Sequence, residues 1–538
     1  MARTSTLLSG RYAVFLACGV LAPLAVLVGM LGVDEAWIAA VPLALLFLLG
    51  VRDITQTRHS IQRNYPVIGH IRWLAEGVRP ELRQYLFEAD EDAAPFSRAQ
   101  RALVYERAKG KPGEHPFGTL LDVYRDGYEF IGHSTRPKPL ADPSTFRIVI
   151  GGPDCKKPYS SSVFNISAMS FGALSANAIR ALNTGARRGG FSHDTGEGGL
   201  SPYHKECGGD VVWEIGSGYF GCRTADGHFD PDRFAEQAAT ETVRMIEIKL
   251  SQGAKPGHGG VLPAAKVTAE IAATRGVPMG QDCVSPSSHS AFSTPLEMMS
   301  FIARLRELSG GKPVGFKLCI GHPWDFMGIV KAMLLAGVTP DFVVVDGGEG
   351  GTGAAPTEFS DHVGAPMREG LLFVHNTLVG AGLRDRIKIG AAGKVVSAFD
   401  IASLLAVGAD WTNAARGFMF AVGCVQSLSC HTNRCPTGVA TQDAARQAAL
   451  IVPDKAERVF NFHRLTLKAL AEMLAAAGLE HPDELMPDHL SRRVSATQIA
   501  QFTQLHILLK PGELLDGSLT SGLYGDSWRR ARADSFED

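Results

Sequence analysis

The sequence lacks an excess of charge of either sign, because 53 lysines and arginines stand against 55 aspartates and glutamates. The net charge of −2 gives no extended basic surface, so we expect no nucleic-acid partner. The nine cysteines are odd in number, which argues against a disulfide framework. No G-x-G-x-x-G motif follows an early strand-like run, which disfavours a doubly wound dinucleotide-binding sheet.

Two long apolar runs lie near the start of the sequence. Residues 12–32 carry no charge and are long enough to cross a bilayer as a helix, and residues 36–51 form a shorter second run. Arginines flank this pair on both sides: Arg3, Arg11, Arg52, Arg58 and Arg63. The positive-inside rule therefore predicts a multi-pass anchor in the inner or cell membrane, with the catalytic domain in the cytoplasm. A signal peptide and a buried helical hairpin are the alternatives.

Beyond the apolar runs, residues 62–111 are polar and charged with helical spacing, which we interpret as a solvated helical spacer. After Thr145, β-rich runs alternate with helix-like runs as far as Arg416. The β-rich runs are FRIVIGG, VFNISAM, VVWEIGSG, MIEIKLS, PVGFKLCI, DFVVVDGG, RIKIGAAG and ADWTNAARG. Such alternation predicts parallel βα units, and most simply an α/β fold built on a (β/α)8 TIM barrel.

These changes of pattern divide the sequence into four expected regions. They are a transmembrane helical hairpin over 1–55, a cytoplasmic helical and extended linker over 56–145, the barrel with its cysteine segment over 146–440, and a helical extension over 441–538. The last region shows no residues that suggest chemistry.

Three cysteines fall within twelve residues of one another: Cys424, Cys430 and Cys435. In a reducing compartment such a group of free thiols favours a metal site over a disulfide. Three thiolates without a fourth cysteine or a nearby C-x-x-C pair do not fit the usual four-ligand zinc or [4Fe–4S] site. A [3Fe–4S] cluster would fit three ligands, and three buried structural cysteines are the alternative.

The segment C-x5-C-x4-C-P-x-G-V-A-T-Q resembles the iron–sulfur segment of the FMN domain in the glutamate synthase family. The resemblance extends over roughly residues 120–450 and implies an FMN-binding barrel whose three cysteines hold a [3Fe–4S] cluster. Full glutamate synthases also carry a glutaminase domain with a catalytic cysteine. We expect no glutaminase here, because Cys18 lies inside an apolar run, so ammonia would come from solution or from a partner.

Small residues follow the last two strand-like runs, where barrels usually bind phosphate. The first loop ends at Gly393, and the second holds Ala414, Ala415 and Arg416. Small side chains let backbone N–H groups approach phosphate oxygens, and Arg416 adds a charged donor. Each loop alone is typical of an ordinary tight turn. As a pair they predict the phosphate site of FMN, the cofactor that the resemblance also implies.

Two further segments resemble the family's flavin pocket. They contain Gly350, Gly351, Thr352 and Gly353 in one, and Ser167, Ala168, Met169 and Ser170 in the other. The first is similar to a D-G-G-T-G-A-S-P loop but carries an extra Gly-Glu, and a flexible loop is the alternative. The second ends an early strand and resembles the segment under the flavin ring.

Lys317 lies in a strand-like run and is expected to point into the barrel mouth. A buried lysine without a partner is costly, but a cation beside flavin N1 and O2 stabilises the negative charge of reduced flavin. The resemblance implies this position for Lys317, and a structural salt bridge is the alternative.

Two segments, T-G-E-G-G with Glu197 and Q-G-A-K-P-G with Lys255, match the family's substrate end, and Arg275 stands at the offset of the family's arginine. The resemblance implies that Lys255 and Arg275 hold the carboxylates of 2-oxoglutarate, a ligand that requires such cations. Glu197 is expected to orient an amine or imine, or to move a proton. Gln252, which opens the second segment, is assigned to the flavin pocket.

Several positions depart from the family pattern at the substrate end. Val261 replaces a glutamine that contacts 2-oxoglutarate, and His258 stands where glutamate is usual. Tyr219 replaces an arginine, Asp194 replaces an asparagine, and the S-P-P-P-H-H segment keeps only His289. These changes affect which substrate we expect, whereas the residues expected to hold the flavin and the cluster keep the family pattern.

Together, the residues and the resemblance predict an FMN-dependent oxidoreductase of glutamate biosynthesis that acts on CH–NH2 groups. Electrons would pass through the [3Fe–4S] cluster to FMN for the reductive amination of a 2-oxo acid, 2-oxoglutarate to glutamate. Expected partners are the small 2-oxo or amino acid, the membrane, and a ferredoxin-like protein or membrane carrier that exchanges electrons, and a homo-oligomer is left open. The alternatives are oxidation of an amino or hydroxy acid that feeds a membrane carrier, and a transferase resembling the N-methylglutamate synthase subunit.

Overall fold

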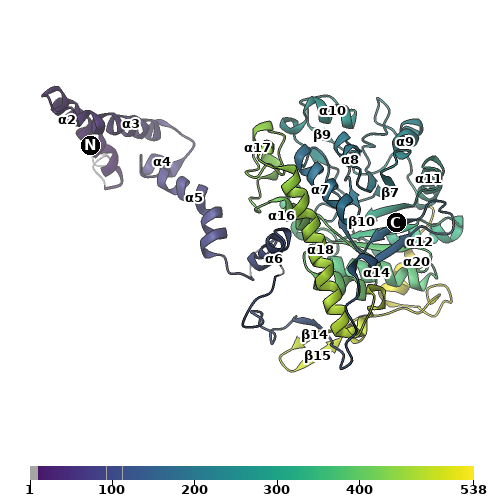
Figure 1. The fold of residues 1–538 in the computed structure, drawn as a ribbon. Coiled ribbons are helices and arrows are strands. Elements are labelled where there is room, and N and C mark those ends of the chain that lie inside the picture. The colour runs from purple at the N-terminus through teal and green to yellow at the C-terminus, as the bar shows by residue number, and fades with distance from the viewer. Residues whose placement is uncertain (1–9, 92–93, 112, 538) are drawn as a thin grey trace. The chain divides into compact units, whose positions relative to one another are not determined.

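The computed structural model describes residues 10–91, 94–111 and 113–537, which form one compact unit up to residue 93 and a second from Ala94 onward (Figure 1). In the first unit, α2 (Ala13–Met30), preceded by the short turn η1 (Gly10–Tyr12), packs against α3 (Ala36–Thr55). The rings of Phe15 and Phe47 stack across this pair with their centroids 5.1 Å apart.

Both helices of this pair are long and apolar enough to cross a membrane, with mean hydropathies of 2.4 and 1.9. Only 17% of each apolar window is buried, so neither is a core helix of the unit described. Length and composition alone do not distinguish a membrane span from a signal sequence. Arg3 and the other residues before Gly10 in the predicted hairpin lie outside the described residues.

The rest of this unit is helical: α4 (Ser60–Asn64), α5 (His70–Leu82) and the π-helical turn η2 (Arg83–Phe87). Asp53 connects α3 to α5, because its buried carboxylate accepts from the Val67 amide at 2.9 Å and lies 2.9 Å from His70 Nε2.

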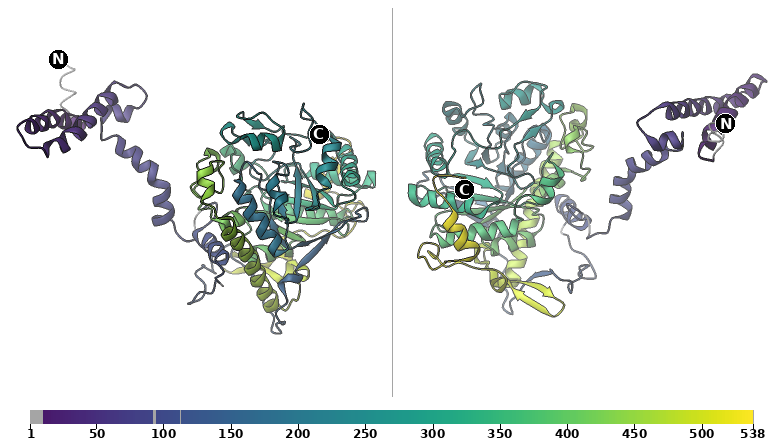
Figure 2. Two further views of the ribbon diagram at one scale, coloured as in Figure 1. Left: turned by 45° about the horizontal axis from the view of Figure 1, so that its top comes forward. Right: turned by 180° about the vertical axis from the view of Figure 1, so that it is seen from behind.

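The predicted TIM barrel is confirmed, since eight parallel strands close into a barrel in chain order (Figures 1 and 2). They are β4 (Phe164–Ile166), β5 (His193–Asp194), β6 (Val211–Ile215), β7 (Val243–Lys249), β10 (Val314–Leu318), β11 (Phe342–Asp346), β12 (Lys388–Ala392) and β13 (Trp411–Ala414). Lys317 stands opposite Lys249 of β7 and Val344 of β11, which places its side chain near the carboxyl ends of the strands.

One strand assigned from the sequence lies outside the barrel, and one barrel strand is missed. The run FRIVIGG forms β2 (Arg147–Ile150), which pairs antiparallel with β3 (Tyr159–Ser162) outside the barrel. Ile150 packs in one cluster with Trp411, the first residue of β13, so this hairpin closes the amino end of the barrel. The barrel strand that the sequence pattern misses is β5, because its two residues, a histidine and an aspartate, form no hydrophobic run.

Helices cover the outside of the barrel. They are α7 (Ala176–Gly189), α8 (Pro202–Glu206), α9 (Pro231–Ala238), α11 (Pro295–Leu308), α12 (Pro323–Ala336), α14 (Met367–Gly380), α15 (Ala398–Ala406) and α16 (Arg416–Val422). Their starts follow capping rules; Ser175 accepts from the Ala178 amide, and Thr294 forms a capping box with Glu297. The short α13 (Thr357–His362), between β11 and α14, lies instead at the carboxyl ends of the strands.

A long excursion, residues 250–294, separates β7 from α11. It holds the antiparallel pair β8 (Val261–Leu262) and β9 (Cys283–Val284), the turn η4 (Ala264–Lys266) and α10 (Ala269–Arg275). It carries several of the cations that the sequence assigns to the substrate end.

The predicted spacer is not solvated throughout. Its last part, α6 (Arg98–Ala108), belongs to the barrel unit, where Val104 is fully buried and Ala108 nearly so. This helix packs against α16 and α18 through the apolar residues on one of its faces. Its many charged residues hide this buried face in the sequence.

The C-terminal region contains strands as well as the expected helices. The long α18 (Val452–Ala477) packs on α7, and β14 (Leu490–Ser495) and β15 (Gln498–Gln501) form a three-stranded sheet with β1 (Glu129–Ile131). Shorter elements complete the unit: η3 (Pro143–Thr145), η5 (Cys430–Thr432), α17 (Ala444–Ala448), η6 (Pro482–Glu484), η7 (Pro487–His489), α19 (Phe502–Leu505) and α20 (Gly522–Arg530).

Candidate active site

A cavity of about 870 Å³ lies at the carboxyl ends of the barrel strands. Its size falls in the range of small-molecule and cofactor pockets, and its position is where barrel enzymes carry their reactive groups. The sequence-predicted residues that line it are Ser167, Ala168, Met169, Ser170, Glu197, Gln252, Lys255, Arg275, Lys317, Gly350, Gly351, Thr352, Gly353, Ala415, Arg416, Cys424 and Cys430. The fold thus brings together segments that are far apart in the chain.

A smaller cavity of about 30 Å³ shares part of this lining and is lined by Gly393. Ala414 lines neither cavity; it is buried at the end of β13, where its carbonyl accepts from the Ser167 amide at 3.1 Å. Two residues that sequence reasoning missed lie at this corner, Lys394 and Phe96.

Backbone packing at the small cavity leaves little room for side chains. A Cβ on Gly351 would come within 2.8 Å of Arg416 Nε. Arg416 lies over the Phe96 ring at 4.7 Å and donates from Nη2 to the Glu349 carbonyl at 2.7 Å. The carbonyl of the extra Gly-Glu in this loop therefore positions Arg416. Lys394 and Arg416 outnumber Asp346, which also lines this cavity, and so offer charged donors for a phosphate group.

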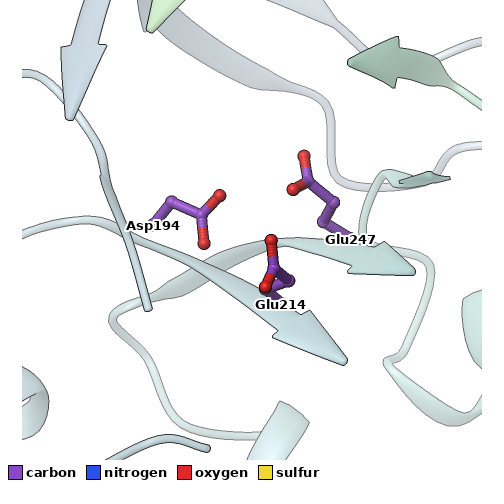
Figure 3. A group of neighbouring side chains, drawn as sticks. All are labelled: Asp194, Glu214 and Glu247. Carbon is purple, nitrogen blue, oxygen red and sulfur yellow. The ribbon is translucent and has the colours of Figure 1, made fainter. Parts of the chain in front are cut away.

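Lys317 reaches the cavity from β10 and is almost completely buried. Its ammonium donates to the Glu214 carboxylate and lies 3.6 Å from Glu247 Oε1. Asp194 completes a group of three carboxyls whose oxygens lie within 4.8 Å of one another (Figure 3). Lys317 therefore forms a buried salt bridge and also lines the cavity, so it agrees with both interpretations of its sequence position.

Burial by itself would lower the pKa of Lys317, but Glu214, Glu247 and Asp194 hold that pKa well above its ordinary value. Burial, followed by the neighbouring Glu214 carboxylate, raises the pKa of Asp194 to about 7. Burial also raises the pKa of Glu247 far above the usual range. The group accordingly combines a buried cation with two carboxyl groups, Asp194 and Glu247, whose pKa values are raised.

Glu197 forms an ion pair with a lysine that the sequence did not single out. Lys249 Nζ donates to Glu197 Oε2 at 2.8 Å and to Gln252 Oε1 at 2.5 Å. Burial would raise the pKa of Glu197, but Lys249, with Arg275 and Lys255 nearby, lowers it to about 2. Glu197 is therefore an anion at neutral pH, which suits holding a cationic nitrogen better than donating a proton.

Lys255 and Arg275 are buried cations that line the same cavity without an ion pair to any described residue. Arg275 Nη2 donates to the Phe171 carbonyl at 3.0 Å, its guanidinium lies over the Phe220 ring at 5.1 Å, and its Nε has no hydrogen-bond partner. Burial lowers the pKa of Lys255. The nearby Glu197 carboxylate lies beyond ion-pair distance of both and is already paired with Lys249, so an anionic ligand in the cavity would stabilise these two buried cations.

Of the residues that depart from the family pattern at the substrate end, Val261 lines the cavity, while His258, Tyr219 and Asp194 do not. Tyr219 and His289 contact each other instead, with the tyrosine hydroxyl 3.1 Å from His289 Nδ1. The Tyr219 substitution is thus accommodated by packing against His289, which the pattern retains, and Val261 is the departure that a ligand would touch.

The cysteine segment adjoins the cavity. Cys435 is nearly fully buried, and Cys424 and Cys430 are half-buried. Burial is the main cause that raises the pKa of Cys424 to about 12. Cys424 and Cys430 both line the cavity. The loop that joins them holds Gln426 and Leu428 at φ of 57° and 55°, a conformation that costs energy for such residues.

The thiol group does not resemble a single-ion site. Among the described residues, the one trio of ligand atoms within 4.8 Å of one another is that of Asp194, Glu214 and Glu247, where the Lys317 ammonium already supplies the cation. Three thiols without a fourth ligand suit an iron–sulfur cluster with three protein ligands better than a four-ligand zinc site.

Lys266, which sequence reasoning also missed, connects the cysteine segment to the cavity. Its ammonium donates to the carbonyls of Ala173, Cys430 and Ala440 at 2.8, 3.3 and 3.3 Å. Burial lowers the pKa of Lys266 to about 8, although Cys430 and Cys435 oppose the shift. The sequence alone does not single out Lys266, because its partners are backbone carbonyls that only the fold brings near it.

These features fit a flavin. The cavity is large enough, one corner offers Arg416, Lys394 and small residues for a phosphate, and the buried Lys317 ammonium faces the interior. The site and fold therefore define a barrel oxidoreductase with thiols beside its cofactor cavity.

Comparison with known proteins agrees with this class. Residues 146–480 match the family model for the conserved region in glutamate synthase. The chain is 38% identical over 496 residues, 85% of its length and 94% of the relative's, to the glutamate synthase large subunit-like protein YerD of Bacillus subtilis (strain 168). A flavocytochrome b2 with sulfite bound aligns at 13% identity and a TM-score of 0.41 over 84% of this chain and 91% of that one, which adds nothing to the assignment.

The chain is also 34% identical over 320 residues to the archaeal-type glutamate synthase (NADPH) of Thermotoga neapolitana, covering 59% of this chain and 60% of that protein. The protein belongs to the glutamate synthase family and is an oxidoreductase acting on CH–NH2 groups. Family membership also indicates a flavin and an iron–sulfur cofactor.

Proposed function

We propose that the protein is a membrane-anchored enzyme that uses FMN and a [3Fe–4S] cluster to aminate a 2-oxo acid reductively, converting 2-oxoglutarate and ammonia to glutamate. The observation that carries this proposal is the pair of buried cations without anions, Lys255 and Arg275, in the same cavity as Lys317 and the thiols. A dicarboxylate would neutralise both cations at the end of the cavity where Val261 and Glu197 lie.

The chain's own residues divide the work within the cavity. Bound FMN would supply hydride transfer. Arg416, Lys394 and the loop from Gly350 would hold its phosphate, and Lys317 would face its ring. Glu197, ionised at neutral pH, would hold the cationic nitrogen of the imine formed from ammonia and the oxo acid. Lys255 and Arg275 would fix the carboxylates.

Cys424, Cys430 and Cys435 would hold the cluster, which exchanges single electrons with a partner protein or carrier. Lys266 would lie between the cluster and the cavity. The two apolar helices would anchor the enzyme, and the arginines that flank them favour a cytoplasmic barrel.

An anaerobic preparation of the full chain tests this assignment. We expect about one FMN and three irons per chain, and bleaching by a reductant that is reversed when 2-oxoglutarate and ammonia are added together. Cys435→Ser should lose iron and keep FMN, since Cys435 does not line the cavity. Retention of reduced flavin with every combination of oxo acid and amine would contradict reductive amination.

The apolar helices favour one second candidate, oxidation of an amino or hydroxy acid with electrons delivered to a membrane carrier. This activity predicts flavin bleaching by the amino or hydroxy acid alone, without any other reductant. The same anaerobic titration therefore distinguishes the two directions of electron flow.

A further inference from the structure

An apolar stripe runs along α5, which follows the apolar helix pair in the chain (Figure 1). Ile71, Leu74, Val78 and Leu82 recur at intervals of three and four residues, which places them on one face of the helix. They are between 42 and 69% exposed, and every residue from 71 to 83 is exposed. Nothing in the described part of the chain therefore covers this stripe, and a contiguous exposed apolar surface indicates a binding partner.

The start of α5 is fixed against the end of α3. Val67, just before α5, has a φ of 67° where the chain turns, and its amide donates to the buried Asp53 carboxylate at 2.9 Å. His70, the first residue of α5, lies 2.9 Å from the same carboxylate through Nε2. In the segment between α3 and α5, the Arg63 carbonyl accepts from the Tyr12 hydroxyl at 3.4 Å. The stripe therefore begins at the end of the helix pair where α2 starts and α3 finishes.

This end of the helix pair is rich in arginine. Between residues 52 and 79 the exposed arginines are Arg52, Arg58, Arg63, Arg72 and Arg79. The acidic residues in the same range are Asp53, which is buried, and Glu76, which lies 3.8 Å from Arg79. Such a surplus of exposed positive charge is complementary to the anionic headgroups of a cytoplasmic lipid surface.

We propose that α5 lies in the plane of the membrane surface, with the apolar stripe in the boundary between lipid headgroups and acyl chains and the arginines beside anionic headgroups. This position requires α2 and α3 to span the membrane, so it rests on the proposed function. An amphipathic helix with arginine on its polar face is the kind of segment that binds such a boundary.

A bilayer accounts for the stripe and the arginines together. The apolar pair is followed at once by the arginine-rich segment, so a membrane that encloses α2 and α3 ends where α5 starts. A second copy of this chain would bring the same arginines together, which like-charge repulsion disfavours. Tyr85, Leu86 and Phe87 of η2 are exposed and extend the apolar surface. The chain then leaves the membrane surface after Phe87 rather than after Thr55.

Photocrosslinking of the full chain in vesicles of phosphatidylethanolamine and phosphatidylglycerol tests this position. The photoreactive residue p-benzoylphenylalanine replaces one side chain at a time: Leu74 or Val78 on the stripe, Glu76 on the polar face as the matched control, and Leu24 in α2 as the reference for the anchor. All four side chains are exposed, so the larger probe disturbs no core packing.

Mass spectrometry then identifies what each probe has captured. We expect lipid adducts at both stripe positions in a yield close to that in α2. The yield at Glu76 should be roughly tenfold lower, because an interfacial helix buries its apolar face about 5–10 Å into the boundary and keeps its polar face outside.

Lipid adducts at Leu24 without any at Leu74 and Val78 would overturn the interfacial position, and so would an equal yield at Glu76. Crosslinks from the stripe to a barrel peptide or to a second copy would overturn it as well, because they would identify a protein partner. These outcomes leave the membrane anchor and the proposed reaction standing. Absence of lipid adducts at all four positions would overturn the anchor together with the interfacial helix. If one stripe variant fails to fold, the other decides the question.

Discussion

The cavity has two ends that carry similar cations in different surroundings. At one end the Lys317 ammonium is nearly buried, pairs with Glu214 and faces two further carboxyls. At the other, Lys255 and Arg275 are equally buried and have no carboxylate within ion-pair distance among the described residues. All three cations are buried to the same extent, so they differ in their ion-pair partners and not in their exposure.

The difference indicates what each end is built to receive. A cation already neutralised by protein carboxylates is part of the folded structure and acts on its surroundings through a fixed charge. A cation without an anion is costly in the empty site and gains most from a ligand that brings one. Stability and ligand affinity should therefore respond in opposite ways to mutation at the two ends.

The largest expected effect is at the paired end. Lys317→Met removes the cation from three buried carboxyls and should lower the free energy of unfolding by about 3–5 kcal/mol, the usual cost of breaking a buried ion pair. Chemical denaturation of the apo protein measures it. Lys317→Arg keeps the charge and should cost less; equal stability of Lys317→Met and the wild type would show that the carboxyls are all protonated.

Glu197 should show the next largest effect, through pH. Its folded pKa of about 2 lies below the unfolded value, so its contribution to stability is complete above about pH 4.5 and is lost as the pH falls toward 2. Glu197→Gln should lower the free energy of unfolding at pH 6 by roughly 2–3 kcal/mol and by progressively less at pH 4 and 3. A deficit that is constant with pH would contradict the Lys249 pairing as its source.

A third cation, Lys266, sharpens the comparison because its partners are carbonyls beside the cysteines. If the three cysteines hold the cluster, Lys266→Met should lower its reduction potential by roughly 60–120 mV, because a positive charge beside the Cys430 carbonyl would stabilise the electron gained. Potentiometric titration measures the shift. Lys266→Arg serves as the control and should stay near the wild-type potential, whereas an unchanged potential in Lys266→Met would place its charge too far from the cluster.

The smallest expected effect on stability belongs to the unpaired end. Lys255→Met removes a buried cation whose neighbouring carboxylate, Glu197, is already paired with Lys249, so the free energy of unfolding of the apo protein should stay within about 0.5 kcal/mol or rise. Thermal unfolding without ligand checks this result. A loss comparable to that of Lys317→Met would mean that Lys255 has a structural partner, and the comparison between the ends would fail.

The sequence predicts the barrel and most of the cavity lining because these depend on short segments. GFKLCI and DFVVVDGG have the continuous apolar character of strands buried on both faces, and both form barrel strands. The cysteine spacing and the glycine loops likewise lie within single stretches of chain. Each of these signals is local.

What the sequence misses depends on contacts between distant segments. β5 is two polar residues long and becomes a strand through its neighbours β4 and β6. Lys249 and Lys266 become recognisable when Glu197 and the carbonyl of Cys430 are placed beside them. The carboxyls around Lys317 come from four separate strands, and no spacing within the chain brings them together.

Binding of 2-oxoglutarate to FMN-loaded protein, wild type against Lys255→Met, tests the assignment of the two ends most directly. Loss of a charge-assisted contact worth about 1.5–3 kcal/mol should weaken the dissociation constant roughly 10- to 150-fold, with the FMN content unchanged. Equal affinity in the two proteins would contradict the account, because the cation without a protein partner would then have no ligand either.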